Sequence, residues 1–136
     1  MRESAEIVIG EFDGRLENAT KLPLPEARRA LQKFPGIAQP GADKILVLTR
    51  AHKVLALDSN GLRVLVRLGY GADDKNYTKM YKSAVAAAEA ELAHDFDALI
   101  DAHLLLRHHG QELCKTSTPR CTACPLKKDC PTGKWR

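Results

Sequence analysis

Apolar residues recur along most of this 136-residue chain at spacings of three and four, the pattern of helices that bury one face. Prolines and glycines separate these stripes, and Gly110 is expected at the C′ position that ends the last one. The five residues Lys53–Leu57 are too few to decide between a short strand and a loop. The chain is therefore predicted to be all-α with five or six helices and little sheet, the helices covering residues 3–11, 23–33, 40–51, 58–69, 77–92 and 96–109.

Length and apolar content indicate an ordinary globular protein. A chain of 136 residues can form one domain with a modest core. No apolar run reaches the roughly 18 residues that a membrane span requires, so no membrane partner is expected.

The four cysteines follow one another as C-x6-C-x2-C-x5-C in a turn-rich segment near the carboxyl end. Four thiolates so close together can converge on one soft metal centre. Disulfides or free thiols are the alternatives, but residues 1–15 lack the apolar run of a secretory signal that would favour disulfides. Zinc usually takes two C-x2–4-C pairs, whereas a single C-x2-C with longer flanking gaps suits an iron–sulfur cubane better. The predicted ligands are Cys114, Cys121, Cys124 and Cys130.

Positive charge is concentrated in the same segment. The whole chain carries a formal charge of +4, whereas residues 114–136 carry +5 and residues 1–113 carry −1. A neutral body with a basic end indicates a docking patch for a polyanion, and a solvated, lysine-rich tail is the alternative. Six cations oppose Asp129 there: Lys115, Arg120, Lys127, Lys128, Lys134 and Arg136. A bound cluster would hold those between the cysteines in fixed positions, which favours phosphate contact.

Residues Phe34–Ala42 (FPGIAQPGA) predict a tight hairpin between two short helices. Gly36 and Gly41 allow a ligand to approach the backbone closely. Amides at the start of the second helix suit a phosphate, although Pro40 removes one of them. A plain corner between two helices is the structural alternative.

Three segments occur in the order found in one known family. The hairpin resembles L-P-G-V-G-x-K-x-A, and Asp58–Val64 resembles D-T-N-x-x-R-V. Asp101–Gln111 resembles the helix that leads into an iron–sulfur loop with the same cysteine spacing. From about residue 25 to its end, the chain therefore resembles the helix-hairpin-helix DNA glycosylases of the endonuclease III type. The cysteine spacing is the most specific of these features.

The resemblance implies a helix-hairpin-helix glycosylase fold, a 4Fe–4S cluster on the four cysteines, and base-excision repair of double-stranded DNA. The reaction would be hydrolysis of the N-glycosidic bond of a damaged or mismatched base flipped out of the duplex. Asp58 matches the catalytic aspartate, and a carboxylate can both stabilise an oxocarbenium-like sugar and take a proton from water. A monomer in the cytoplasm, at the nucleoid, is expected. The expected DNA contacts are Gly36, Ile37, Ala38, Gly41, Lys44, Arg63, Lys127 and Lys128.

The hairpin lacks the lysine that some members of the family have there. Members that cleave the backbone use this amine to form a Schiff base at the sugar C1′, but the alignment puts Pro40 there. Lys44 lies on the same helix face about 6 Å further along the axis. A phosphate contact or a solvated side chain is favoured over catalysis for Lys44, so lyase chemistry is predicted to be absent or weak. Ala38 also replaces the second hairpin glycine.

The second departure is length. Only about 33 residues precede the Phe34-Pro35-Gly36 turn, fewer than the helical bundle that the family places there, so a fragment, a truncated gene model or a reduced relative is expected. Residues 1–52 are interpreted as the end of that bundle with the hairpin, residues 53–113 as the lobe carrying Asp58, and residues 114–136 as the iron–sulfur loop.

Several of these residues also have a structural interpretation. Asp58 precedes an apolar stripe and can cap a helix, which is compatible with catalysis. Arg63 and Arg67 share a helix face and can contact phosphates or be solvated. His103 and His109 are expected to pack and form hydrogen bonds near the cluster lobe and not to be ligands. Two alternatives to a glycosylase follow: a non-catalytic DNA-binding module, and a zinc-stapled interaction domain that needs only the cysteines.

Overall fold

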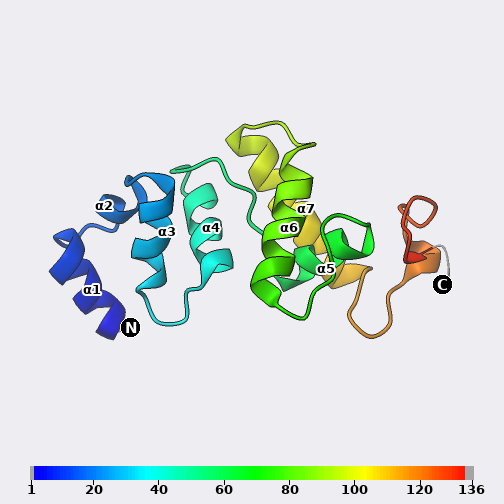
Figure 1. Cartoon of the computed structure of the whole chain (residues 1–136), viewed down its shortest axis with the longest axis horizontal. Coiled ribbons are helices and arrows are strands. Elements are labelled where there is room, and N and C mark those ends of the chain that lie inside the picture. Colours follow the sequence, from blue (N-terminus) through cyan, green and yellow to red (C-terminus); the bar gives the residue numbers. More distant parts are fainter. Residues whose placement is uncertain (1, 134–136) are drawn as a thin grey trace. The chain divides into compact units, whose positions relative to one another are not determined.

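The computed structural model describes residues 2–133 of the chain. Residues 134–136, which carry two cations of the predicted basic segment, lie outside this range. Within it the chain forms seven α-helices, one 3-10 turn and no strand (Figure 1). No helix in this range is both long and apolar enough to cross a membrane. The elements are α1 (Arg2–Phe12), α2 (Glu17–Thr20), α3 (Leu24–Gln32), α4 (Gln39–Leu48), α5 (Ser59–Arg67), α6 (Tyr77–Glu89), α7 (Phe96–Glu112) and η1 (Cys121–Ala123).

The all-α prediction is confirmed, with one helix more than predicted. The additional helix, α2, has only four residues, too few for a periodic apolar pattern to appear. The described residues form two compact units that divide between Val54 and Leu55. The three-part division predicted from the sequence stays a prediction.

The first unit contains α1 to α4 and has a small core of alanines, leucines and aromatic rings. Phe12 and Phe34 stack with ring centroids 6.4 Å apart. Between α3 and α4, the Arg28 guanidinium donates to the fully buried Asp43 carboxylate at 2.8 Å. This ion pair ties together the two helices on either side of the hairpin turn.

Helix α4 begins as the sequence predicts and ends earlier. Pro40 lies in its first turn, where a missing N–H costs nothing. The helix stops at Leu48 because Arg50 takes a left-handed φ of 57°. The amides of Ala51 and His52 then fold back onto the Leu46 carbonyl oxygen, at 2.9 and 3.1 Å.

The second unit is built on α5, which packs against α6 and α7. Its core includes Tyr81, Leu62 and Leu99. The undecided segment Lys53–Leu57 is not a strand. Its last residues are buried loop, and the Leu55 amide donates to the Glu89 carboxylate at 2.7 Å. The Glu89 side chain on α6 thus accepts a backbone hydrogen bond of the kind that a neighbouring strand accepts in a sheet.

The prediction for Gly110 is wrong. This glycine lies inside α7, which continues to Glu112. A Cβ atom at Gly110 would lie 2.7 Å from the Asn60 carbonyl oxygen, so the glycine is needed for close packing of α5 and α7 and not for ending the helix. Helix α6 is also shorter than predicted and ends at Glu89 instead of Leu92.

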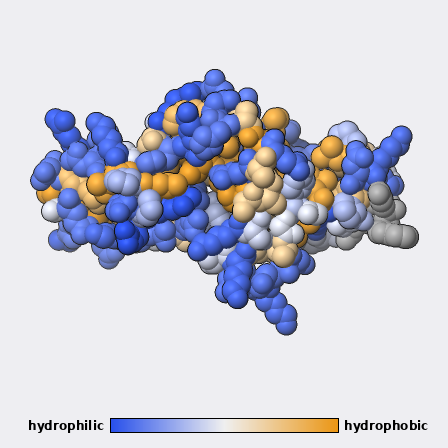
Figure 2. All heavy atoms as spheres, turned by 45° about the horizontal axis from the view of Figure 1, so that its top comes forward, coloured by the Kyte–Doolittle hydropathy of each residue, from blue (hydrophilic) through white to orange (hydrophobic). Residues whose placement is uncertain are grey.

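Several large apolar side chains remain on the surface, where hydrophobic areas lie between hydrophilic ones (Figure 2). On α7, Leu104 is 46% exposed and Leu105 is 68% exposed. Helical spacing places Phe96, Leu99, Ile100, His103 and Leu104 on one face of this helix, and of these only Leu99 and His103 are fully buried. The stripe is therefore narrower than the sequence pattern indicates.

Candidate functional site

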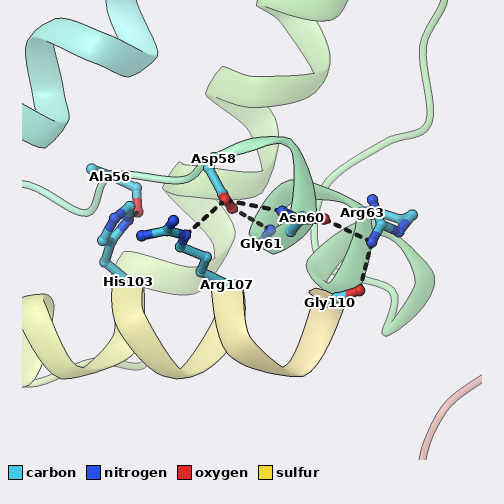
Figure 3. A network of polar contacts seen from close by, with 8 residues as sticks. All are labelled: Ala56, Asp58, Asn60, Gly61, Arg63, His103, Arg107 and Gly110. Atoms are coloured by element: carbon cyan, nitrogen blue, oxygen red, sulfur yellow. Dashed lines mark hydrogen bonds and ion pairs between the residues drawn. The ribbon is translucent and has the colours of Figure 1, made fainter. Parts of the chain in front are cut away.

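Asp58 lies at the N-terminus of α5, where its side chain caps the helix (Figure 3). One carboxylate oxygen, Oδ1, accepts the Gly61 amide hydrogen at 2.7 Å. The other, Oδ2, accepts from the Asn60 side-chain amide at 3.2 Å. The capping role is confirmed, and because three-quarters of the Asp58 side chain is buried, its carboxylate has a defined orientation. The catalytic role stays a prediction.

Two further side chains approach this carboxylate, and sequence reasoning did not find them. The Arg107 guanidinium, from α7, has its Nε atom 3.7 Å from Asp58 Oδ2. Burial first, and the Asp58 charge second, raise the pKa of the Tyr77 phenol above its ordinary value. The one available signal was a cation, Arg107, directly after three leucines on a predicted helix.

His103 has the packing and hydrogen-bonding role that was predicted. It is buried, and its Nδ1 atom lies 2.9 Å from the Ala56 carbonyl oxygen (Figure 3). Its other ring nitrogen, Nε2, has no hydrogen-bond partner among the described residues. The bond to Ala56 fixes the loop that leads into Asp58.

Arg63 and Arg67 connect α5 to the segment that carries the first cysteine. Arg63 donates to the Gly110 carbonyl oxygen at 2.7 Å and to that of Cys114 at 2.8 Å. Arg67 donates to the Lys115 carbonyl oxygen at 2.7 Å and lies 3.3 Å from the Cys114 sulfur. Neither side chain is simply solvated. Both hold the start of the cysteine segment against the helix that Asp58 caps.

The four cysteines are free thiols of intermediate exposure. Their segment and α5 enclose an apolar cavity, to which Val64, Leu68 and Leu113 contribute. Two nitrogen donors lie near the sulfurs: the Gly133 amide is 3.3 Å from Cys130 Sγ, and His109 Nε2 is 3.6 Å from Cys124 Sγ. The cavity lining includes all four predicted ligands, Cys114, Cys121, Cys124 and Cys130.

His109 is on α7, and its side chain lines this cavity. Burial first, and the adjacent His108 second, lower the pKa of the His109 ring. The neutral ring that this shift favours has one nitrogen that donates a hydrogen bond and one that accepts. This confirms the predicted packing and hydrogen-bonding role of His109 near the cluster lobe.

The basic residues of the cysteine segment differ in their surroundings. Lys127 and Arg120 line the cavity, and Arg120 is exposed. Lys128 is exposed and does not line the cavity. These cations lie between the cysteines in the sequence, so a group bound by the four sulfurs would also restrain the positions of the cations.

The hairpin belongs to the first unit, and Asp58 belongs to the second. Gly36 has a left-handed φ of 78° and is exposed, as is Ala38, which opens α4 without a side-chain cap. Ile37 packs against Gly41, where an added Cβ atom would lie 3.4 Å from the Ile37 side chain. Lys44 is half-buried on α4. The predicted hairpin is present, and its role in DNA binding stays a prediction.

Comparisons with known proteins were made by family model, by sequence and by structure. No family model matches the chain. Endonuclease III of Rickettsia prowazekii (strain Madrid E) is 28% identical over 134 residues, which cover 90% of this chain and 59% of that protein. Endonuclease III of Escherichia coli (strain K12) is 26% identical over 132 residues, with 90% and 59% covered. A thymine/uracil-DNA glycosylase of Methanothermobacter thermautotrophicus is 25% identical, with 96% and 54% covered.

Two solved structures have the same fold. One is a trapped covalent intermediate of endonuclease III with DNA, with a TM-score of 0.71 and 24% identity over 96% of this chain and 55% of that one. The other is a thermostable thymine-DNA glycosylase, with a TM-score of 0.70, 22% identity and 96% of this chain covered. The chain spans less than two thirds of the curated relatives it matches. The predicted resemblance to endonuclease III-type proteins and the predicted fold are confirmed over this part.

Proposed function

We propose that this chain acts in base-excision repair as a DNA glycosylase that hydrolyses the N-glycosidic bond of a damaged or mismatched base. The observation that carries the proposal is the placement of Asp58. Its carboxylate caps α5, and the other end of the same helix binds the segment with four cysteines. This arrangement occurs in a chain whose sequence and fold resemble endonuclease III.

Asp58 would supply the chemistry. As the base leaves, positive charge develops on the sugar, and a fixed carboxylate stabilises that charge without reorganising. The same carboxylate can take the proton that an attacking water loses. The Gly61 amide fixes Oδ1 by a hydrogen bond, so we assign Oδ2 to the reacting sugar and water. Its bond to Asn60 is longer, at 3.2 Å, and leaves this oxygen able to accept another hydrogen bond.

The cysteine segment is suited to a 4Fe–4S cluster, which we propose as its cofactor. No group of three or more His, Cys, Asp or Glu side chains in residues 2–133 is placed to hold a single metal ion. Tetrahedral zinc would need sulfurs about 3.8 Å apart, given Zn–S bonds of about 2.3 Å. A cubane takes each thiolate on a different iron and so accommodates wider spacing. The apolar lining, Arg67 and the Gly133 amide favour a bulky anionic group.

Duplex DNA is proposed to contact both units. In the first, the turn with Gly36, Ile37, Ala38 and Gly41 would contact a phosphate, with Lys44 on α4 nearby in sequence. The Ile37 amide already donates to the Phe34 carbonyl oxygen at 3.2 Å, so the amides of the other three residues would bind it. In the second, a cluster would fix Lys127 and Lys128 as a cationic surface. Arg63 already donates to two carbonyl oxygens, so we assign it to positioning the cysteine segment and not to a phosphate.

Backbone cleavage by elimination is not part of the proposal. Pro40 occupies the position of the family's lysine and has no nucleophile. Lys44, one helical turn further, is half-buried on α4, and we assign it to phosphate contact. The expected product is therefore an abasic site in an intact strand.

The proposal is tested by incubating the full chain, purified without oxygen, with duplexes carrying uracil, thymine opposite guanine, or oxidised pyrimidines. Release of free base that falls at least about 100-fold in Asp58→Asn is expected, because one electrostatic contact in a transition state is worth that much. Asp101→Asn, an exposed acid on α7, is the matched control. Covalent trapping by borohydride would contradict the assignment of Pro40 and Lys44.

A non-catalytic DNA-binding module is the second candidate, and one observation favours it. Pro40 removes the family's nucleophile, while Asp58 is already satisfied as a helix cap and partner of Arg107. Tight binding to every one of these duplexes, without base release from any, would establish this alternative.

A further inference from the structure

Arg107 lies beside the proposed catalytic carboxylate without being committed to it. Its Nε atom is 3.7 Å from Asp58 Oδ2, too far for a hydrogen bond but close enough for an ion pair. The Arg107 side chain is 44% exposed, and that of Asp58 is 25% exposed. Among the described residues, this ion pair is the only polar contact that the Arg107 guanidinium makes.

The helix cap does not need Arg107. Oδ1 of Asp58 is held by the Gly61 amide and Oδ2 by the Asn60 side chain, so the carboxylate stays oriented without a cation. The ion pair also lacks a hydrogen bond and its Arg107 end is 44% exposed, so it contributes little to stability. A role in folding therefore does not explain why an arginine lies here.

The two arginines of α5 already bind the cysteine segment. Arg63 donates to Gly110 and Cys114, and Arg67 donates to carbonyl oxygens in the cysteine segment. Arg107 differs from both in that neither of its terminal nitrogens makes a hydrogen bond to the described residues. Its Nε faces Asp58 (Figure 3), and the two terminal nitrogens of its planar fork can hold a second anion.

A carboxylate that works on a nucleotide meets an electrostatic obstacle. The flanking phosphates carry negative charge, and like charges at close range repel in a partly buried site. A guanidinium between the two anions offsets this repulsion and can bind phosphate through two parallel hydrogen bonds.

We propose that Arg107 is a positioning residue that bridges Asp58 and one backbone phosphate beside the flipped nucleotide. This inference rests on the proposed glycosylase function, because it needs a nucleotide at Asp58. Arg107 attracts the phosphate with its terminal nitrogens and sets the distance between the sugar and the carboxylate. The reaction itself is unchanged, and Arg107 exchanges no proton.

The test combines protein variants with neutral phosphates. Wild type, Arg107→Gln and Arg107→Lys are assayed on duplexes in which each phosphate flanking the lesion is replaced, one at a time, by an uncharged methylphosphonate. Single-turnover base release gives the maximal rate and the half-saturating concentration. Binding to a duplex with a non-hydrolysable abasic analogue is measured in parallel. Lys82→Gln, an exposed cation on α6, is the control for general charge loss.

In the wild type, one methylphosphonate position is expected to weaken binding about 10-fold, the size of one charge-assisted contact. Arg107→Gln is expected to show the same loss with normal DNA and no further loss at that position. Arg107→Lys should recover only part of it, since an ammonium cannot bind bidentately. Lys82→Gln should lose affinity equally at all positions or not at all.

The outcomes separate the two proposals. If Arg107→Gln loses as much as the wild type at every methylphosphonate, the bridge is wrong, whether or not base is released. If the wild type releases no base but binds the abasic-analogue duplex in an Arg107-dependent way, the glycosylase function is wrong and the phosphate contact stands. If the wild type binds none of the duplexes, both are overturned.

Discussion

The two compact units hold their candidate functional residues in different ways. In the second unit, side-chain hydrogen bonds join Asp58, α5, α7 and the cysteine segment into one network. In the first unit, the hairpin turn relies on backbone turns, a left-handed Gly36 and one ion pair behind it. A group that reacts needs fixed direction, whereas a backbone that meets a phosphate needs only to be exposed. The difference in bonding matches this difference in proposed task.

This comparison has an energetic consequence. A substitution in the network of the second unit should destabilise several segments together, because Arg63 and Arg67 each donate to more than one carbonyl oxygen. A substitution in the first unit should have a more local effect, because the Arg28–Asp43 pair joins two neighbouring helices, α3 and α4. The following experiments test this contrast, in order of decreasing effect.

The largest effect is expected from Cys114→Ala. Losing one ligand should abolish the absorbance near 400 nm that an iron–sulfur cluster gives, and should destabilise the second unit by more than about 3 kcal/mol, because ligation supplies folding energy. Hydrogen exchange should rise across α5 and the cysteine segment and stay unchanged in α3 and α4. Unchanged exchange in α5 would contradict the network.

Gly110→Ala should come next. The new Cβ atom would lie 2.7 Å from the Asn60 carbonyl oxygen, and forcing α5 away from α7 should cost about 2–3 kcal/mol in denaturant unfolding. Gly10→Ala is the matched control, since nothing lies within 4 Å of its added Cβ atom. In that exposed helix the change should stabilise by about 0.5–1 kcal/mol. Equal effects at the two glycines would refute the close helix contact.

Arg28→Met probes the first unit. It takes a cation away from Asp43, which has no exposed surface, and should cost about 1–2 kcal/mol because a buried carboxylate loses a charged donor. Arg29→Met, next to it on α3 and 73% exposed, should change stability by less than about 0.5 kcal/mol. Hydrogen exchange in the second unit should not respond to either change.

The smallest effect concerns Tyr77. Because the Asp58 charge is the second cause of the raised pKa of Tyr77, Asp58→Asn should lower that pKa only part of the way to its ordinary value, and burial should maintain the remainder. Titration of carbon-labelled tyrosine by NMR measures this shift. Asp101→Asn should leave it unaltered, and an upward shift in Asp58→Asn would show that Asp58 does not face the phenol.

Much of this fold follows from local rules that act within one segment. Pro40 in the first turn of α4 and Asp58 as the cap of α5 follow from which residues tolerate helix starts. Position along the chain alone misled at Gly110, because the reason for that glycine is Asn60, fifty residues earlier. The pattern of apolar residues within one helix does not indicate which residue of another helix will pack against it.

The same limit applies to the site. The cysteines could be grouped from spacing alone, since they are close in sequence. Arg63 and Arg67 were weighed only as exposed side chains, because their partners lie on the cysteine segment about fifty residues further on. The sequence does not single out Arg107, because its proposed role depends on Asp58, which tertiary packing brings within 3.7 Å of its Nε atom.

Arg67 touches the cysteine segment at both of its ends. Its guanidinium lies 3.3 Å from the first cysteine sulfur, and its carbonyl oxygen lies 3.3 Å from the sulfur of Cys130. If the proposed cluster binds these sulfurs, it is therefore coupled through Arg67 to a helix about 13 Å long, whose other end carries the Asp58 carboxylate. Oxidative loss of such a cluster would then disturb the cysteine segment and the orientation of the carboxylate together.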